Sequence, residues 1–160
     1  MSRGDSDEVY VLDLCDQDLG TAGSRQHRFD WLLGDPGRNG QRRRLPVDGY
    51  WANHQLVVEY RELQHDGPNA FFDKPERLTV SGVHRGQQRA IYDARRDELI
   101  PAHGLHLVVI KPADLDATPR GRLRRNADHD ITAVTQKLRL VTDAGALPEH
   151  FEPSGPPLGN

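Results

Sequence analysis

Apolar and polar residues alternate in two neighbouring segments near the middle of the chain. Both segments, 45–51 and 55–62, are rich in Val, Leu, Tyr and Trp, which favour β-strands. The break between them, Ala52-Asn53-His54, suits the turn of a hairpin. Pairing the two strands around this turn places Asp48 directly opposite Glu59. Each strand therefore carries a carboxylate where a core strand usually has none.

These two acids share a face of the predicted hairpin with Arg61, because side chains two positions apart point the same way. Opposed like charges repel, and burying an unpaired carboxylate is costly, so a compensating cation is expected. Mg²⁺ suits this arrangement, since it commonly binds one or two protein carboxylates and keeps water and phosphate oxygens as its other ligands. In the alternative interpretation Arg61 alone neutralises Glu59 and Asp48 only begins the turn, and the hairpin by itself favours that structural ion pair.

The remaining apolar spacing predicts helices on either side of the hairpin and one more strand. Helices are expected at 7–19, 25–33, 86–101 and 131–141, and an apolar run predicts a buried strand at 105–110. This last strand is expected to lie parallel to the strand that carries Glu59, joined to it by a right-handed crossover. The predicted fold class is α/β, with a small mixed central sheet, made of the hairpin and the crossover strand, flanked by helices.

A length of 160 residues suits one domain, which we assign to 1–145 with its core at 25–110. The segment 66–86 has no clear period and is expected to fold over the acidic face as a flap. The Pro- and Gly-rich end, 146–160, has too few apolar residues to fold and predicts a disordered tail.

Composition also limits the cellular setting. With 36% apolar residues and no window near the roughly 18 apolar residues of a membrane span, no membrane partner is expected. The segment MSRGDSDE lacks the apolar centre of a signal peptide. A single cysteine, Cys15, cannot form an internal disulfide, and its apolar neighbours favour a small core residue over a nucleophile. We therefore expect a cytoplasmic protein.

The formal net charge of −3 does not indicate a nucleic-acid binder, but the basic residues are clustered. Of 21 Lys and Arg residues only three are Lys, and guanidinium groups fork onto phosphate oxygens in a way that ammonium groups do not. The helix at 86–101 also carries a polar stripe, which suits either a phosphate-facing helix or a solvated helix with internal ion pairs. An Arg-rich genome explains the bias equally well. The candidate phosphate-binding residues are Arg43, Arg44, Gln88, Arg89, Asp93 and Arg96.

The order of these motifs resembles the PD-(D/E)XK nuclease superfamily, in particular its very-short-patch-repair-endonuclease-like branch. The resemblance covers residues 45–110 and is carried by LPVDGYW, QLVVEYRELQH and QQRAIYDARRDELIPAHGLHLVVI. Members of that branch combine an acidic hairpin strand, an apolar strand ending in an acid, a His, a helix with an Asp-x-x-Arg element and a final apolar strand. The resemblance implies a restriction-endonuclease-like fold, in which the helix at 25–33 corresponds to the family's leading helix.

The resemblance also implies roles for individual residues. Asp48 and Glu59 would hold Mg²⁺, for which Mn²⁺ would substitute, and His65 would lie near the scissile phosphate. Asp93 and Arg96 would brace the site or contact substrate from the crossover helix. The chain departs from the family at its lysine, where Arg61 stands.

Arginine does not lose its proton in proteins, so Arg61 would act as an electrostatic clamp on the phosphate. Removal of a proton from water would then depend on the metal or on His65.

These observations predict a metal-dependent endonuclease that hydrolyses phosphodiester bonds, with DNA as the expected substrate in repair, restriction or mobile-element functions. A homodimer or a protein partner is expected to supply specificity, because no groove-reading motif is present. One alternative is a catalytically inactive nucleic-acid-binding or partner-binding module on the same fold, in which Arg61 replaced lysine when cleavage was lost. Another is an ordinary α/β domain with an interaction role.

Overall fold

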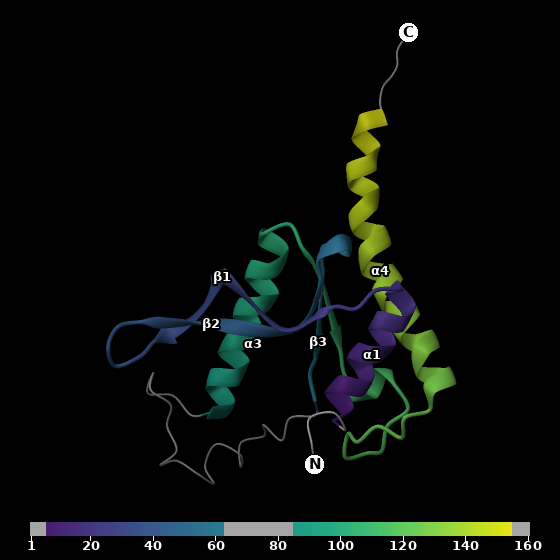
Figure 1. The fold of residues 1–160 in the computed structure, drawn as a ribbon, viewed down its shortest axis with the longest axis horizontal. Coiled ribbons are helices and arrows are strands. Elements are labelled where there is room, and N and C mark those ends of the chain that lie inside the picture. The colour runs from purple at the N-terminus through teal and green to yellow at the C-terminus, as the bar shows by residue number, and fades with distance from the viewer. Residues whose placement is uncertain (1–5, 63–84, 155–160) are drawn as a thin grey trace.

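The fold is a four-stranded mixed sheet with helices on both faces (Figure 1). The structure, a computed structural model, describes residues 6–62 and 85–154, with side chains as far as residue 142. In the strand order β1-β2-β3-β4 the first three strands are antiparallel and β3 and β4 are parallel. The strands are β1 (Ser24–Pro36), β2 (Arg42–Trp51), β3 (Leu56–Tyr60) and β4 (His106–Ile110). The predicted small mixed α/β sheet flanked by helices is confirmed.

Two helices cover one face of the sheet and a third covers the other. The side chains of α1 and α4 form one apolar cluster with β3 and β4, whereas α3 packs against β1, β2 and the opposite side of β3. The first cluster is built around Leu12, Trp51 and Val58, and the second around Val47, Val57 and Ile100. The helices are α1 (Asp7–Leu19), α3 (Arg85–Ala102) and α4 (Ala127–Ser154), with 3-10 turns η2 (Ala52–His54) and η3 (Pro112–Asp114).

The predicted hairpin register is confirmed. The pairs Gly49↔Val58, Tyr50↔Val57 and Trp51↔Leu56 flank the η2 turn, as expected for a turn at 52–54. The strand predicted at 105–110 lies beside β3 in the parallel sense, with Tyr60 paired to Ile110. The helices expected at 7–19 and 86–101 are α1 and α3.

The helix expected at 25–33 is wrong, because this segment forms the edge strand β1. Its sequence, HRFDW, alternates aromatic residues with charged ones, and a strand separates them onto two faces. The apolar residues at 29, 32 and 33 also fit a helical period, but the alternation at 27–31 is that of a strand. The first helix of the fold is therefore α1.

The C-terminal helix is longer than the spacing of apolar residues indicated. Apolar positions predicted a helix at 131–141, whereas α4 runs from Ala127 to Ser154 and continues into the segment expected to be a disordered tail. The core also extends beyond 25–110, because Val11 and Leu12 of α1 and Leu138 of α4 are fully or almost fully buried. The expected flap at 66–86 lies almost entirely outside the described residues.

The interior of the first cluster leaves no space around Trp51. A Cβ atom on Gly49 would lie 2.7 Å from the indole ring, and one on Gly23 would lie 2.3 Å from it. The indole N–H donates to Asp16 Oδ1 at 3.0 Å and to the carbonyl of Thr21 at 3.1 Å. Glycine is therefore required at both positions so that α1, β1 and β2 can close over this ring. Cys15 is fully buried in the same cluster, and burial raises the pKa of its thiol to about 12, as expected for a core cysteine.

Candidate functional site

The candidate active site is formed where the paired segment of β2 and β3 ends. Beyond the Gly49↔Val58 pair, the two strands are joined by hydrogen bonds from the backbone to side chains. The backbone N–H of Tyr60 donates to Asp48 Oδ2 at 2.8 Å, and the backbone N–H of Asp48 donates to Glu59 Oε2 at 3.0 Å. Each of the two acids thus binds the backbone of the opposite strand, and we refer to Asp48 and Glu59 as the acidic pair. The prediction that they meet across the hairpin is confirmed.

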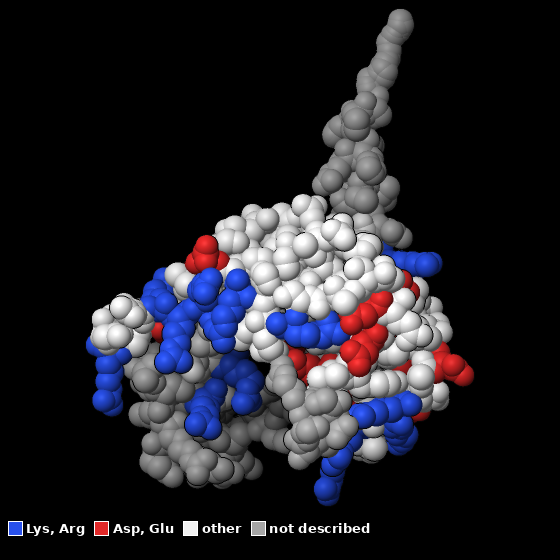
Figure 2. Space-filling model, viewed as in Figure 1, with Lys and Arg blue, Asp and Glu red and all other residues white. Residues whose placement is uncertain are grey.

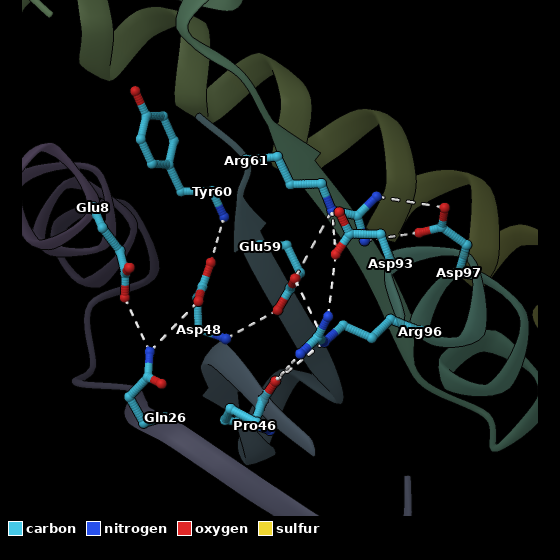
Figure 3. A network of polar contacts seen from close by, with 10 residues as sticks. All are labelled: Glu8, Gln26, Pro46, Asp48, Glu59, Tyr60, Arg61, Asp93, Arg96 and Asp97. Atoms are coloured by element: carbon cyan, nitrogen blue, oxygen red, sulfur yellow. Dashed lines mark hydrogen bonds and ion pairs between the residues drawn. The ribbon is translucent and has the colours of Figure 1, made fainter. Parts of the chain in front are cut away.

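Two arginines lie beside Glu59 on the side that faces α3 (Figure 3). Arg61 Nε and Arg96 Nε are each 3.8 Å from Glu59 Oε1, which is within ion-pair distance but too long for a hydrogen bond. Arg96 donates to the carbonyl of Pro46 at 3.0 and 3.1 Å and pairs with Asp93 at 3.1 Å. Arg96 thus ties α3 to β2, and the expected role of Asp93 and Arg96 in bracing the site or contacting substrate stays a prediction.

Arg61 is held mainly by the helix rather than by the acidic pair. Its guanidinium group donates twice to the carboxylate of Asp97, at 2.9 and 3.4 Å, and its Nε lies 3.7 Å from Asp93. That Nε atom is buried and has no hydrogen-bond partner among the described residues. The interpretation in which Arg61 alone neutralises Glu59 therefore does not describe this site, because Asp97 takes its strongest contacts and Arg96 lies equally close to Glu59.

Negative charge exceeds positive charge in this network. In the described part of the chain, the four carboxylates of Asp48, Glu59, Asp93 and Asp97 face two guanidinium groups, those of Arg61 and Arg96. Glu59 is 4% exposed. Burial and the neighbouring Asp48 raise the pKa of Glu59 to about 7, and burial also raises the pKa of Asp48. Among the described residues, the two arginines therefore compensate the acidic pair only in part.

A third strand also supports Asp48. Gln26 of β1 lies opposite Asp48 between two paired residues, and its amide Nε2 is 3.5 Å from Asp48 Oδ1 and 3.1 Å from Glu8 Oε2 of α1 (Figure 3). The backbone of Gln26 has a φ of 50°, a left-handed conformation that costs about 1–3 kcal/mol in a residue other than glycine. Neither Gln26 nor Glu8 was predicted, and recognising HRFDW as a strand would have placed Gln26 next to Asp48.

The donor set of the acidic pair fits a hard divalent cation. Among residues 6–62 and 85–142, Asp48 Oδ1 has only a long contact with Gln26, and Glu59 Oε1 has only the two 3.8 Å contacts with arginine. Each carboxylate therefore keeps an oxygen with coordinating capacity toward these residues. Within residues 6–62 and 85–142, no three Asp, Glu, His or Cys side chains come together as a metal cage. Two carboxylates are nevertheless the number that Mg²⁺ commonly takes from a protein when water and phosphate complete its shell.

A cleft of about 620 Å³ opens beside this network. Arg61 and Asp93 lie on one wall, Glu62 and Lys111 follow the carboxyl ends of the parallel strands β3 and β4, and the segment 112–121 forms the opposite wall. Ligands of α/β proteins commonly bind beyond the carboxyl ends of parallel strands. Asp48 and Glu59 do not themselves line the cleft, and the network reaches it through Arg61 and Asp93, which belong to both.

Other predicted residues lie elsewhere. Arg43 and Arg44 are exposed at the start of β2, and Arg44 pairs with Asp30 at 3.0 Å. Arg44 is four residues before Asp48, which is about 13 Å along an extended strand. Figure 2 shows Lys and Arg side chains gathered over the β1–β2 end of the molecule. The structure thus separates this arginine cluster from the acidic pair.

Gln88 and Arg89 occupy the start of α3, before Asp93, with Gln88 half-buried and Arg89 exposed. Their role in binding phosphate stays a prediction. His65 lies outside the described residues, so its role also stays a prediction. Among the described residues, no helix has both the length and the apolar character that crossing a membrane requires.

No protein-family model matches the chain, and comparisons with curated proteins and with solved structures found no significant match. The functional interpretation therefore depends on the geometry of the acidic pair and its surroundings.

Proposed function

We propose that the protein is a metal-dependent endonuclease that hydrolyses phosphodiester bonds in DNA, on an α/β sheet of the restriction-endonuclease-like type. The observation that supports this most strongly is the meeting of Asp48 and Glu59 across two strands, in a network where carboxylates outnumber guanidinium groups among the described residues. A buried pair of carboxylates is costly unless something binds it. A binding module that presents phosphate to this surface would gain nothing from two acids there.

Asp48 and Glu59 would hold Mg²⁺ or Mn²⁺. When bound, such an ion polarises a phosphodiester and lowers the pKa of a coordinated water. Arg61 keeps its charge at any physiological pH and lines the cleft, so it can stabilise the negative charge that develops on a phosphoryl oxygen. Arg96 holds α3 against β2 and thereby positions Glu59. In this proposal His65 transfers a proton.

The test is cleavage of DNA by the purified full-length chain with Mg²⁺ or Mn²⁺. Supercoiled plasmid, single-stranded and branched DNA are incubated with the ion and with EDTA. We expect nicking only with the ion, and a loss of at least about 100-fold in the variants Asp48→Asn and Glu59→Gln, because each removes a ligand charge. The matched controls are Asp30→Asn and Glu98→Gln, which alter exposed acids away from the acidic pair.

Each outcome decides between the candidate functions. Cleavage that depends on the metal and on both acids, and that survives in the two controls, supports the nuclease. Protein that shifts DNA in a gel but leaves all three substrates intact with Mn²⁺ identifies a binding module instead. Cleavage that persists equally in Asp48→Asn and Glu59→Gln would place the active site elsewhere and refute the assignment.

A further inference from the structure

The cleft beside the acidic pair has the size of a pocket for a small molecule. Its volume of about 620 Å³ lies within the range of about 300–1,000 Å³ typical of ligand pockets. It opens where the parallel strands β3 and β4 end, and the backbone N–H of Arg61 donates to the carbonyl of Ile110 at 2.9 Å, which holds the two strand ends together. Such a cleft admits one nucleotide, whereas a stacked duplex must first release a base to enter a pocket of this kind.

The far wall of the cleft is fixed by hydrogen bonds. The segment 112–121 begins with η3 and turns back through an isolated bridge between Ala117 and Leu123. The backbone N–H of Asp116 donates to the buried carboxylate of Asp130 at 3.0 Å, and that of Leu123 donates to Asp7 at 3.0 Å. These contacts tie the wall to α4 and α1, so the cleft belongs to the folded core.

The lining combines an apolar wall with two cations, Arg61 and Lys111, and two acids, Glu62 and Asp93. Pro112, Leu115 and Ala117 contribute apolar surface, which suits a base or a sugar. Lys111 follows β4 directly, and its backbone N–H donates to Asp114 Oδ2 at 2.8 Å, which fixes where its side chain starts. Asp114 itself pairs with Lys137, and no carboxylate in the described part of the chain pairs with Lys111. Arg61, the other cation of the lining, is already bound to Asp97.

We propose that this cleft binds a single unpaired nucleotide, with its phosphate on Lys111 and its base or sugar against the wall formed by 112–121. The inference rests on the proposed function and extends it, because it names an unpaired nucleotide as the part of the substrate that enters the site. Lys111 thus adds a second cation to the lining, beside Arg61, whose guanidinium group already binds Asp97.

The experiment titrates the full-length chain with thymidine 5′-monophosphate, thymidine and inorganic phosphate, followed by calorimetry and by amide NMR shifts. We expect the nucleotide to bind more tightly than either part. Lys111→Gln should weaken nucleotide binding about tenfold and leave thymidine binding unchanged, because it removes one charge-assisted contact to phosphate. Ala113→Trp, at an exposed position of the lining, should abolish binding of both. The control is Arg139→Gln, which removes an exposed cation of α4 that does not line the cleft.

The outcomes separate this inference from the proposed function. Nucleotide binding that is unchanged in Lys111→Gln and Ala113→Trp, or absent in the wild type, overturns the cleft site. DNA cleavage that needs Asp48 but is unaffected by Lys111→Gln and Ala113→Trp refutes the inference and leaves the nuclease standing. Nucleotide binding through Lys111 without cleavage of any DNA refutes the nuclease and leaves the cleft site standing.

Discussion

Replacing Glu59 with Gln should remove a pH dependence of folding stability that the buried acid creates. The pKa of Glu59 is raised from 4.5 to about 7, chiefly by burial and then by Asp48. The folded chain therefore holds this proton more tightly than the unfolded chain between these two values. Unfolding then releases a proton, so the free energy of unfolding falls as the pH rises from about 4.5 to 7 and levels off above that. The stability that Glu59 contributes is fully present below its unfolded pKa, and it is lost as the pH rises through the pKa of the folded state.

The magnitude follows from the same two values. A tenfold difference in proton affinity between folded and unfolded states is worth about 1.4 kcal/mol, so the metal-free protein should lose up to about 3 kcal/mol across this range. Gln keeps an acceptor for the backbone N–H of Asp48 but does not titrate. Other titrating groups contribute equally to both proteins. The difference in the free energy of unfolding between wild type and Glu59→Gln should therefore isolate Glu59 and change steeply with pH. Because Asp48 and Glu59 interact, the titration belongs to the pair. Asp48→Asn should therefore reduce the slope of the free energy of unfolding against pH.

The assay is urea unfolding at pH 5, 6, 7 and 8 in EDTA, followed by circular dichroism, with Glu98→Gln as a surface control on α3. Repeating the series with Mg²⁺ should reduce or reverse the slope, because a cation favours the ionised form of Glu59. Parallel stability curves for wild type and Glu59→Gln would refute the claim that Glu59 is held in a charge-poor environment. A steep pH dependence of the stability difference that Mg²⁺ does not change would support the buried acid and contradict its binding of a metal ion.

Two further predictions concern the core that holds the hairpin. Gly49→Ala should lower the free energy of unfolding by about 1–3 kcal/mol, because the added Cβ would lie 2.7 Å from the ring of Trp51. Urea unfolding checks this beside the control Gly37→Ala, whose Cβ meets only ordinary contacts. Equal unfolding midpoints for the two variants would contradict the prediction. Asp16→Ala should lower the free energy of unfolding by about 3 kcal/mol, because the carboxylate of Asp16 accepts from the Gly23 backbone, the Trp51 indole and the Arg25 guanidinium. Thermal unfolding should show little change in the exposed control Asp13→Ala. Equal decreases in the melting temperature of both variants would contradict this.

The part of the site that was predictable from sequence depends on local geometry. A three-residue turn fixes the register of a hairpin, so alternation around 52–54 was enough to bring Asp48 and Glu59 together. The parallel position of β4 followed from a long helix between two apolar strands. Such features need only the order and spacing of neighbouring residues.

The rest of the site depends on contacts between distant parts of the chain. Arg96 donates to the carbonyl of Pro46, and Gln26 contacts both Glu8 and Asp48. The spacing of these residues in the sequence predicts neither set of contacts. The wall of the cleft could not be predicted from local spacing, because its hydrogen bonds to Asp130 and Asp7 come from helices at opposite ends of the chain. The helix predicted at 25–33 would not bring Gln26 to the site, since only a strand places this residue opposite Asp48.

The most direct measurement of the central claim is a crystal structure of the wild type soaked in MnCl₂, with an anomalous difference map recorded at the manganese edge. The account predicts a peak bridging the carboxylates of Asp48 and Glu59, and its disappearance from crystals of Glu59→Gln. A map without a peak at the acidic pair, in crystals where Asp48 and Glu59 keep the hydrogen bonds described here, would contradict it.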